Sequence, residues 1–230
     1  MTAANIVSSP LPSSAAPLPL AGRVALVTGG SRGIGREISS QLAALGARVV
    51  INYASNSGKA DELVEELASR GHQSVAFREA FGSPPHIVVA CAGIMDPKYP
   101  ALADTAVEDF DATFAVNTRG KFLVCREAAR RIPPHSGGRI VALSSTTVAV
   151  LLPGYGAYTA SNAAVEAMTR ILAKEMFFAG KDEAFVRKVE ERSMGRLAET
   201  TEVASVVTFL VSDAAAWVNG QVIRVNGGFA

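Results

Sequence analysis

The feature that most constrains the fold is a glycine-rich turn at residues 28–35. The turn follows a short apolar run, Val24–Val27, and leads into residues 36–45, where apolar side chains recur on one face of a helix. Glycines let a chain turn tightly and approach a pyrophosphate closely, while a helix N-terminus presents backbone N–H groups to negative charge. A strand, a turn and a helix in this order predict a dinucleotide-binding unit.

The pattern continues with a second strand and a second helix. Residues 48–52 form another apolar run, and residues 59–70 have the periodicity of an amphipathic helix that ends at Gly71. Alternating strands and helices predict a parallel sheet covered on both faces, a Rossmann-like doubly wound α/β fold. With 230 residues and 49% apolar composition, we expect a single domain with a sizeable core.

Residues 1–22 differ from the rest of the chain in composition. They are rich in Ser, Ala and Pro and carry no charged side chain. This composition favours a disordered arm over 1–22, before a domain over 23–230, and lacks the basic start of a secretory signal. Absent acidic residues would suit a plastid transit peptide, but the Arg enrichment of such peptides is missing. We therefore expect a cytoplasmic protein, with a plastid location as the alternative.

The charges and cysteines exclude several kinds of partner. There are 22 basic and 21 acidic residues, so nothing indicates attraction to nucleic acid or to an acidic membrane surface. No run reaches the about 20 apolar residues of a membrane span. Cys91 and Cys125 are too few for a disulfide framework or a zinc site, and we expect both to be buried thiols. Small molecules or other subunits are the expected partners.

The residues that follow the second strand help to choose the dinucleotide. A ribose with a free 2′-hydroxyl is usually held by a carboxylate there, whereas a 2′-phosphate prefers a cation. Asn52, Tyr53, Ala54 and Ser55 include no acid, and Arg32 in the glycine-rich turn can supply positive charge. The sequence therefore favours NADP(H) over NAD(H), although a solvated Arg32 remains an alternative.

A third unit combines a strand and a helix with hydroxyl side chains between them. The apolar run 139–143 predicts a buried parallel strand, which ends at Ser144 and Ser145, and a helix opens near Tyr158. Ligands bind at the carboxyl ends of strands in open α/β sheets. This stretch is therefore the expected place of any chemistry.

Together these motifs resemble the short-chain dehydrogenase/reductase family, from Arg23 to the C-terminus. The residues that carry the resemblance are Thr28, Gly29, Gly33, Gly35, Ala92, Gly93, Asn117, Ser145, Tyr158 and the segment 219–228. The chain is similar to the plant NADPH-dependent aldehyde reductases of that family. The resemblance implies a cofactor site made of Gly29, Ser31, Arg32, Gly33, Ile34, Gly35, Asn52, Tyr53, Ala54, Ser55, Ala92, Gly93, Tyr158 and Asn162.

The resemblance also implies a mechanism. A hydride moves between the nicotinamide and a carbonyl carbon, Tyr158 acts as acid and base, and Ser145 polarises the carbonyl. The family places a lysine four residues after this tyrosine, where its ammonium favours the phenolate, but here the position holds Asn162. An amide can still bind a ribose hydroxyl, yet it supplies no charge. Asn117, which in the family helps to hold a water connected to that lysine, completes the expected site.

Two connections are shorter than is usual for such a fold. Only residues 78–85 separate the expected third strand, 73–77, from the fourth, 86–90, which leaves no room for a helix. After the helix that opens near Tyr158, residues 176–180 lead directly into an expected polar helix at 181–192. The sixth strand that the resemblance implies has no counterpart between them.

The remaining elements complete the expected sheet. Residues 107–131 predict a long helical region, 201–210 another helix, and 222–225 a last strand. That strand could occupy the vacant place beside Ile140 and Val141. We therefore expect fewer strands than the seven usual for the family.

Three interpretations follow from the sequence. The first is an NADPH-dependent reductase acting on a small-molecule carbonyl or alcohol, impaired by Asn162. The second is a non-catalytic relative that binds NADP(H) or a partner subunit, and the third is a poorly folded product. The resemblance implies a homodimer or homotetramer.

Overall fold

The computed structural model describes residues 17–77, 85–133, 136–178 and 199–225. The strands are β1 (Val24–Thr28), β2 (Arg48–Asn52), β3 (Ser74–Phe77), β4 (Ile87–Ala90) and β5 (Arg139–Ala142). The helices are α1 (Gly33–Ala44), α2 (Ser57–Ser69), α3 (Val107–Phe114), the π-helical turn η2 (Ala115–Gly120), α4 (Lys121–Arg131), α5 (Thr147–Val150), α6 (Gly156–Phe178) and α7 (Thr200–Val211). Two short 3-10 turns are η1 (Leu102–Asp104) and η4 (Asp213–Ala215).

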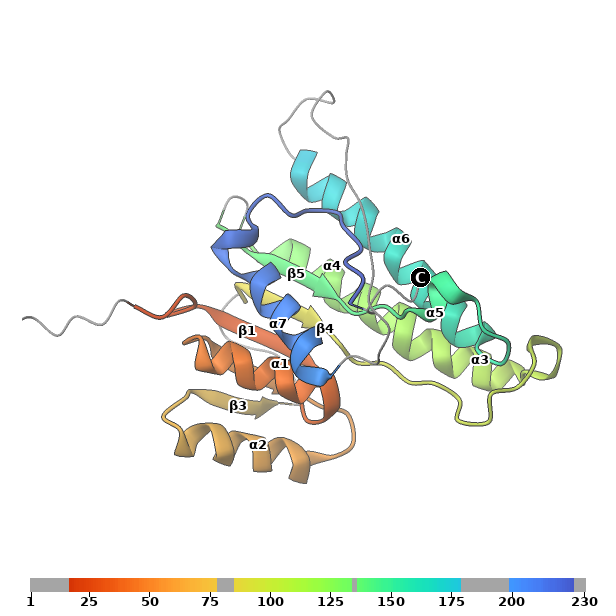
Figure 1. The fold of residues 1–230 in the computed structure, drawn as a ribbon, viewed down its shortest axis with the longest axis horizontal. Coiled ribbons are helices and arrows are strands. Elements are labelled where there is room, and N and C mark those ends of the chain that lie inside the picture. Colours follow the sequence, from red (N-terminus) through yellow and green to blue (C-terminus); the bar gives the residue numbers. More distant parts are fainter. Residues whose placement is uncertain (1–16, 78–84, 134–135, 179–198, 226–230) are drawn as a thin grey trace, which may run out of the picture.

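The described strands form one parallel sheet. Its order is β3-β2-β1-β4-β5, with β1 at the centre (Figure 1). This arrangement confirms the Rossmann-like doubly wound fold, and the five strands of the described residues agree with the expectation of fewer than seven. Because all strands run in the same direction, their carboxyl ends lie along one edge of the sheet.

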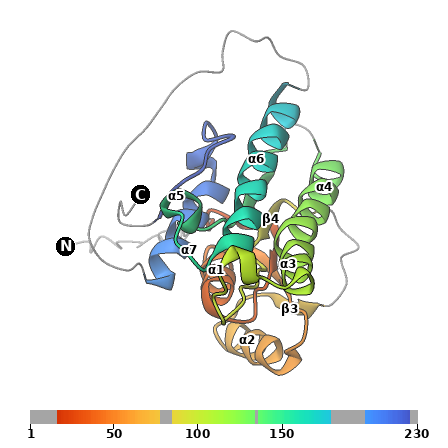
Figure 2. The same ribbon diagram turned by 90° about the vertical axis from the view of Figure 1, so that its right-hand side faces the viewer.

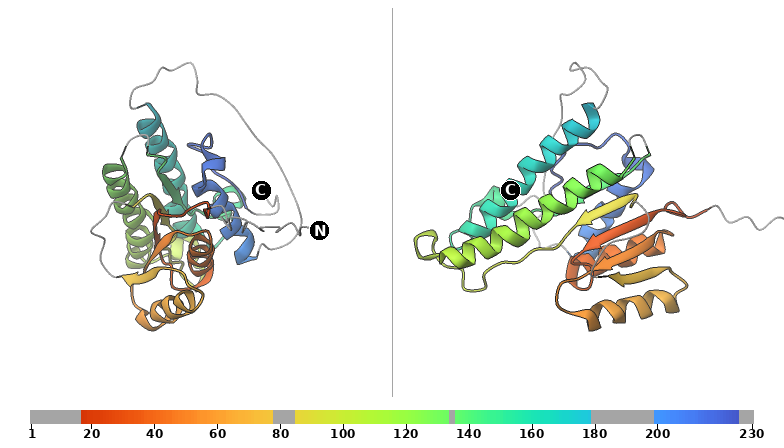
Figure 3. Two further views of the ribbon diagram at one scale, coloured as in Figure 1. Left: turned by 90° about the vertical axis from the view of Figure 1, so that its left-hand side faces the viewer. Right: turned by 180° about the vertical axis from the view of Figure 1, so that it is seen from behind.

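Helices cover both faces of this sheet. Helices α1 and α7 pack against each other on one face, whereas α4 covers β4 and β5 on the other, with α6 beside it (Figures 2 and 3). The long helical region expected over 107–131 is present as α3, η2 and α4, which follow one another without a break. The π-helical turn within it is a local widening that the sequence pattern did not predict.

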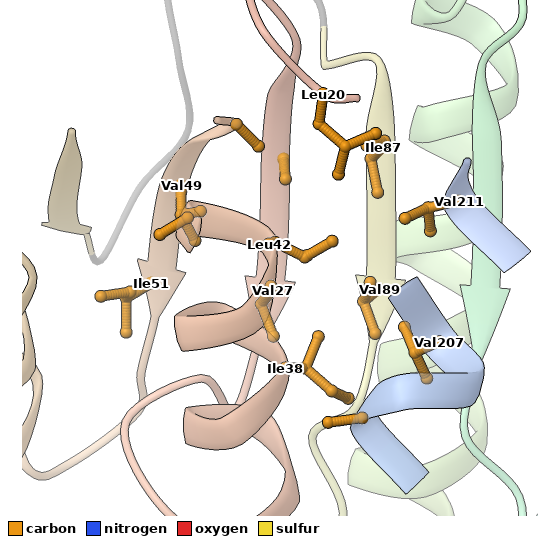
Figure 4. Close-up of a cluster of buried hydrophobic side chains, with 14 of the residues drawn as sticks. Leu20, Val27, Ile38, Leu42, Val49, Ile51, Ile87, Val89, Val207 and Val211 are labelled. Carbon is orange, nitrogen blue, oxygen red and sulfur yellow. The ribbon is translucent and has the colours of Figure 1, made fainter. Parts of the chain in front are cut away.

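The main core lies between the sheet and the helices α1, α2 and α7. Figure 4 shows side chains of three neighbouring strands, among them Val49, Val27 and Val89, facing Leu42 of α1 and Val207 of α7. A smaller cluster, Val88 with Ala128 and Ile132, lies on the face covered by α4. Strands buried on both faces explain the continuous apolar runs that the sequence contains.

The folded region begins before Arg23. Leu20 is 0% exposed and belongs to the main core, and its backbone N–H donates to the carbonyl of Leu45 at 2.9 Å. The boundary expected at residue 23 is therefore too late, because the composition of 1–22 concealed one apolar anchor. Residues 1–16 lie outside the described part of the chain.

The expected last strand is wrong. Val222–Val225 has no regular secondary structure, and β5 pairs with β4 alone among the described strands. The segment before it is attached to α6 instead, because Asn219 Nδ2 donates to the carbonyl of Ala173 at 3.2 Å. The connection 78–85, apart from Pro85, and the helix expected at 181–192 lie outside the described residues.

Candidate active site

Three strand ends bring the expected cofactor residues together. The N–H of Gly30 donates to the carbonyl of Asn52 at 3.1 Å, which ties the glycine-rich turn to the end of β2. The hydroxyl of Thr28 accepts from the N–H groups of Cys91 at 3.1 Å and Ala92 at 3.2 Å, which ties the same turn to the end of β4. The turn, the residues after β2 and the Ala92–Gly93 loop therefore form one edge.

At two positions of the turn, the surrounding backbone leaves no room for a side chain larger than that of glycine. A Cβ on Gly35 would lie 2.2 Å from the carbonyl oxygen of Gly29, a distance that no side chain can occupy. Gly29 itself has φ +66°, and a Cβ there would lie 3.0 Å from the Cα of Ala92. The backbone therefore folds tightly on itself at these two glycines, where a side chain would not fit.

The N-terminus of α1 suits a negatively charged group. The first N–H groups of a helix have no partner within it, and Arg32, which precedes α1, makes no side-chain cap. The first turn of α1 contains no acidic residue. These free donors and the helix dipole fit a pyrophosphate, and the exposed Arg32 beside them fits a further phosphate.

The expected catalytic residues line one cavity of about 1790 Å³. Ser145 lies three residues after β5, Tyr158 is the third residue of α6, and both line the cavity together with Ile34 of the glycine-rich turn. The cavity extends along the free edge of β5 and is larger than the about 300–1,000 Å³ of an ordinary ligand site. Its size follows from the missing neighbour of β5 among the described strands.

The two serines after β5 are held in different ways. The Ser145 hydroxyl accepts from the backbone N–H of Thr147 at 3.3 Å and from the Thr147 hydroxyl at 3.1 Å. Ser144 instead donates to a carboxylate oxygen of Glu166 on α6 at 2.9 Å. Ser144 therefore joins β5 to α6, whereas no acceptor for the Ser145 hydroxyl proton is found among the described residues.

Asn162 and Asn117 do not line this cavity. Asn162 is 2% exposed, and its Nδ2 donates to the carbonyl of Tyr158 on the same helix at 2.9 Å. Asn117 is fully buried in η2, where its side chain both accepts from and donates to the backbone of Ile94 at 2.8 Å and donates to Ser161 at 3.1 Å. Asn117 therefore fastens the loop after β4 to α6.

Lys121 is a residue that the sequence reasoning missed. It is the first residue of α4, only 5% exposed, and its Nζ donates to the carbonyl of Leu143 at 2.6 Å. Burial lowers its pKa below the ordinary value for lysine. Lys121 lies four residues, or one helical turn, after Asn117. This spacing places both residues on one helix face and was the sequence signal that could have pointed to Lys121.

Cys91 and Cys125 are free thiols that are partly buried, not fully buried as expected from the sequence. Their partial burial raises the pKa of each thiol to about 11. Within the described residues, no group of three or more His, Cys, Asp and Glu side chains could hold a metal ion. None of the described helices is long and apolar enough to cross a membrane.

Known proteins resemble this chain over nearly its whole length. A family model described as Enoyl-(Acyl carrier protein) reductase matches residues 29–180 and 177–230. The NADPH-dependent aldehyde reductase-like protein, chloroplastic, of Arabidopsis thaliana is 46% identical over 259 residues, which include 93% of this chain and 96% of the relative. NADPH-dependent aldehyde reductase 2, chloroplastic, of the same plant is 43% identical over 275 residues, with 99% of each chain covered.

A solved structure agrees with the fold. The short chain dehydrogenase from Burkholderia cenocepacia J2315 in complex with NADP superposes with a TM-score of 0.76 and 28% sequence identity. The match covers 91% of this chain and 98% of that chain.

The same comparisons reveal internal gaps. The first alignment has 259 positions but includes 93% of 230 residues, about 214, so about 45 positions of that relative have no counterpart here. The family model matches in two pieces that meet at residues 177–180. This junction lies where the sequence lacks the strand expected after the helix that contains Tyr158.

Proposed function

Because the chain belongs to the short-chain dehydrogenase/reductase family, we propose that it is an NADPH-dependent reductase of small aldehydes or ketones. The observation that carries this proposal is the common cavity of Ile34, Ser145 and Tyr158. It joins the end of the glycine-rich turn to the two residues that would act on a carbonyl. Turnover is expected to be slow, since Asn162 stands where the family has a lysine.

Several observations support NADP(H) as the cofactor. Two relatives are named NADPH-dependent, and the solved structure contains NADP. In this chain Arg32 is exposed beside the N-terminus of α1, and residues 52–55 contain no carboxylate that would repel a 2′-phosphate. The glycine-rich turn would hold the pyrophosphate through backbone N–H groups.

Tyr158 and Ser145 would carry the proton chemistry. When bound, NADPH supplies the hydride that reduces the carbonyl carbon. The Ser145 hydroxyl donates to the carbonyl oxygen and polarises it, and Tyr158 gives that oxygen its proton. A phenol with a reference pKa of about 10 exchanges protons poorly at neutral pH unless a nearby cation favours the phenolate.

Asn162 favours a second candidate function. Its amide donates to the carbonyl of Tyr158, so this side chain stabilises its own helix and adds no charge to the cavity. A chain that binds NADP(H) without turnover, acting as a cofactor-binding or subunit-partner protein, would have the same fold. The two functions differ only in whether NADPH is consumed.

The test is NADPH oxidation with a panel of aldehydes and small ketones. We expect slow consumption that Tyr158→Phe abolishes while NADPH binding, measured by calorimetry, persists. If NADPH binds but neither the natural chain nor Asn162→Lys consumes it with any of these substrates, the non-catalytic function is correct.

The relatives also bear on location. Both Arabidopsis relatives have names that include the word chloroplastic. We propose the plastid, the alternative to the cytoplasm, for this chain. A fluorescent protein fused behind residues 1–22 should accumulate in plastids, and diffuse cytoplasmic fluorescence would contradict this location.

A further inference from the structure

Lys121 is a buried cation without a carboxylate partner. Its side chain forms no ion pair within the described residues, and the carbonyl of Leu143 is the one hydrogen-bond acceptor found for it there. An ammonium has three N–H donors, so two of them lack an acceptor in the described part of the chain. Burying a charge this way is costly unless further partners are supplied.

The position of Lys121 points to the source of these partners. Its Nζ lies 4.0 Å from the place that a Cβ on Gly93 would occupy, next to the loop expected at the cofactor. Leu143, which accepts from it, is two residues before Ser145. Lys121 also lines the cavity that contains Ser145 and Tyr158. The ammonium therefore lies in the part of this cavity that holds the expected catalytic residues, away from the glycine-rich turn.

The neighbouring ionisable groups do not neutralise this charge. Cys91 follows β4 and Cys125 lies on α4, and both interact electrostatically with Lys121. Burial raises the pKa of each thiol to about 11, so both are uncharged at neutral pH. A polar ligand that enters the cavity would be the missing partner.

We propose that Lys121 binds the cofactor, donating hydrogen bonds to the ribose hydroxyls at the nicotinamide end and supplying the positive charge that Asn162 lacks. The inference rests on the proposed function and extends it to a residue on a different helix. Lys121 reaches the cavity from α4. Asn162, which occupies the family's lysine position on α6, is hydrogen-bonded to the Tyr158 carbonyl instead.

A purely structural role makes a different prediction. If Lys121 served only to hold the Leu143 carbonyl, its removal would alter the fold and weaken every ligand alike. A contact with the nicotinamide end affects only ligands that contain that end. Adenosine 2′,5′-bisphosphate contains the adenosine half and the 2′-phosphate but no nicotinamide, so it separates the two roles.

The experiment is calorimetric titration of the full chain with NADPH and with adenosine 2′,5′-bisphosphate. Lys121→Met should weaken NADPH binding about tenfold to a hundredfold, the loss expected for a charge-assisted hydrogen bond, and leave the bisphosphate unchanged. Lys121→Gln keeps an N–H donor without the charge, so its NADPH affinity should lie between those of the natural chain and Lys121→Met. Arg131→Met, which removes an exposed cation from the other end of α4, should change neither affinity.

The remaining outcomes overturn the inference in distinguishable ways. Unchanged NADPH affinity in both Lys121 variants, or equal weakening of both ligands, contradicts the cofactor contact and leaves the proposed function intact. If Lys121→Met does not fold, the same comparison is made with Lys121→Gln. A natural chain that binds neither ligand contradicts the proposed function as well.

Discussion

Tyr158 and Asn162 lie one helical turn apart on α6, and the Asn162 amide donates to the Tyr158 carbonyl at 2.9 Å. At the residue scale this contact is the basis for the slow turnover that we propose. The side chain that could have carried charge is neutral and is turned toward its own helix. In the proposed mechanism, Tyr158 would therefore need another cation to act as an effective acid and base.

The first prediction concerns Asn162→Lys. An ammonium one turn from Tyr158 favours the phenolate, so the rate of NADPH-dependent aldehyde reduction should rise about tenfold or more. Asn162→Gln, which lengthens the amide without adding charge, is the matched control and should give no rise. An unchanged or lower rate in Asn162→Lys, with intact NADPH binding, contradicts the role given to this position.

The second prediction concerns the stability of Lys121→Met. Removing a buried cation should raise the Tm at about pH 7 by about 2–6 °C, because an apolar side chain of similar length has no desolvation cost. The pKa of Lys121 is lowered by burial from an ordinary value of 10.5. Below the folded-state pKa the lysine is charged in both states, so the cost of burial is fully present.

The lowered pKa of Lys121 determines how the Tm difference between Lys121→Met and the natural chain changes with pH. As the pH rises toward 10.5, the folded chain releases the Lys121 proton before the unfolded chain does, and the cost disappears. The Tm advantage of Lys121→Met should therefore shrink at alkaline pH. Because Cys91 and Cys125 interact electrostatically with Lys121 and ionise near this pH, both proteins are compared with the two cysteines replaced by serine. A difference that stays constant with pH would contradict a charged, buried Lys121.

At the scale of elements, the third prediction concerns the β1–turn–α1 unit, which we propose binds the cofactor. Gly35→Ala should reduce NADPH affinity by more than tenfold and lower the Tm, because its Cβ would lie 2.2 Å from the Gly29 carbonyl oxygen. Gly58→Ala in α2 is the control, since its Cβ would meet nothing nearer than Asn56 Oδ1 at 3.8 Å. That control should be neutral or slightly stabilising. Full NADPH affinity in Gly35→Ala would show that the turn does not bind the pyrophosphate.

The sequence predicted those elements whose signals are local. The order of β1, α1, β2 and α2 follows from apolar periodicity and glycine turns, and Asn56 accepts from the N–H of Lys59 to begin α2 two residues earlier than expected. The strand expected at 222–225 failed because a strand depends on a partner elsewhere in the sheet. A short apolar run alone does not supply that partner.

The sequence also predicted where the motif residues of the candidate site lie in the sheet. The motif residues around Gly29, Ala92 and Ser145 do lie at strand ends on one edge of the sheet. Lys121 was missed because a charged residue within a helical pattern is normally solvated, and its burial depends on how α4 packs against β5. The hydrogen bonds between the Asn117 side chain and the Ile94 backbone were likewise not predictable, because they depend on tertiary structure.

At the scale of the whole molecule, the chain is a shortened version of its relatives. About 45 alignment positions of the first relative are missing, and β5 lies at an edge of the described sheet. Apolar side chains are exposed near that edge, including Ile171 on α6 and Ile223. The molecule nevertheless retains the layered core of α1, α2 and α7 on the sheet.

The fourth prediction is that the chain self-associates. Exposed apolar surface along α6 and the residues after α7 favours burial against a second copy. Light scattering coupled to size-exclusion chromatography should give the mass of a homodimer or homotetramer. Ile171→Glu, which places a charge on this surface, should shift the mass toward the monomer, and Glu108→Lys on the exposed start of α3 should not. A monomer at all concentrations would contradict the prediction.

Cofactor binding by the shortened fold is tested by calorimetric titration of the chain with NADPH and NADH. We expect saturable binding with NADPH at least about tenfold tighter, because a 2′-phosphate next to Arg32 gains a charge-assisted hydrogen bond. Arg32→Ala should remove most of that preference and leave NADH binding nearly unchanged. No heat of binding with either nucleotide, from a chain that unfolds cooperatively, would contradict the claim that this shortened fold retains the family's cofactor site.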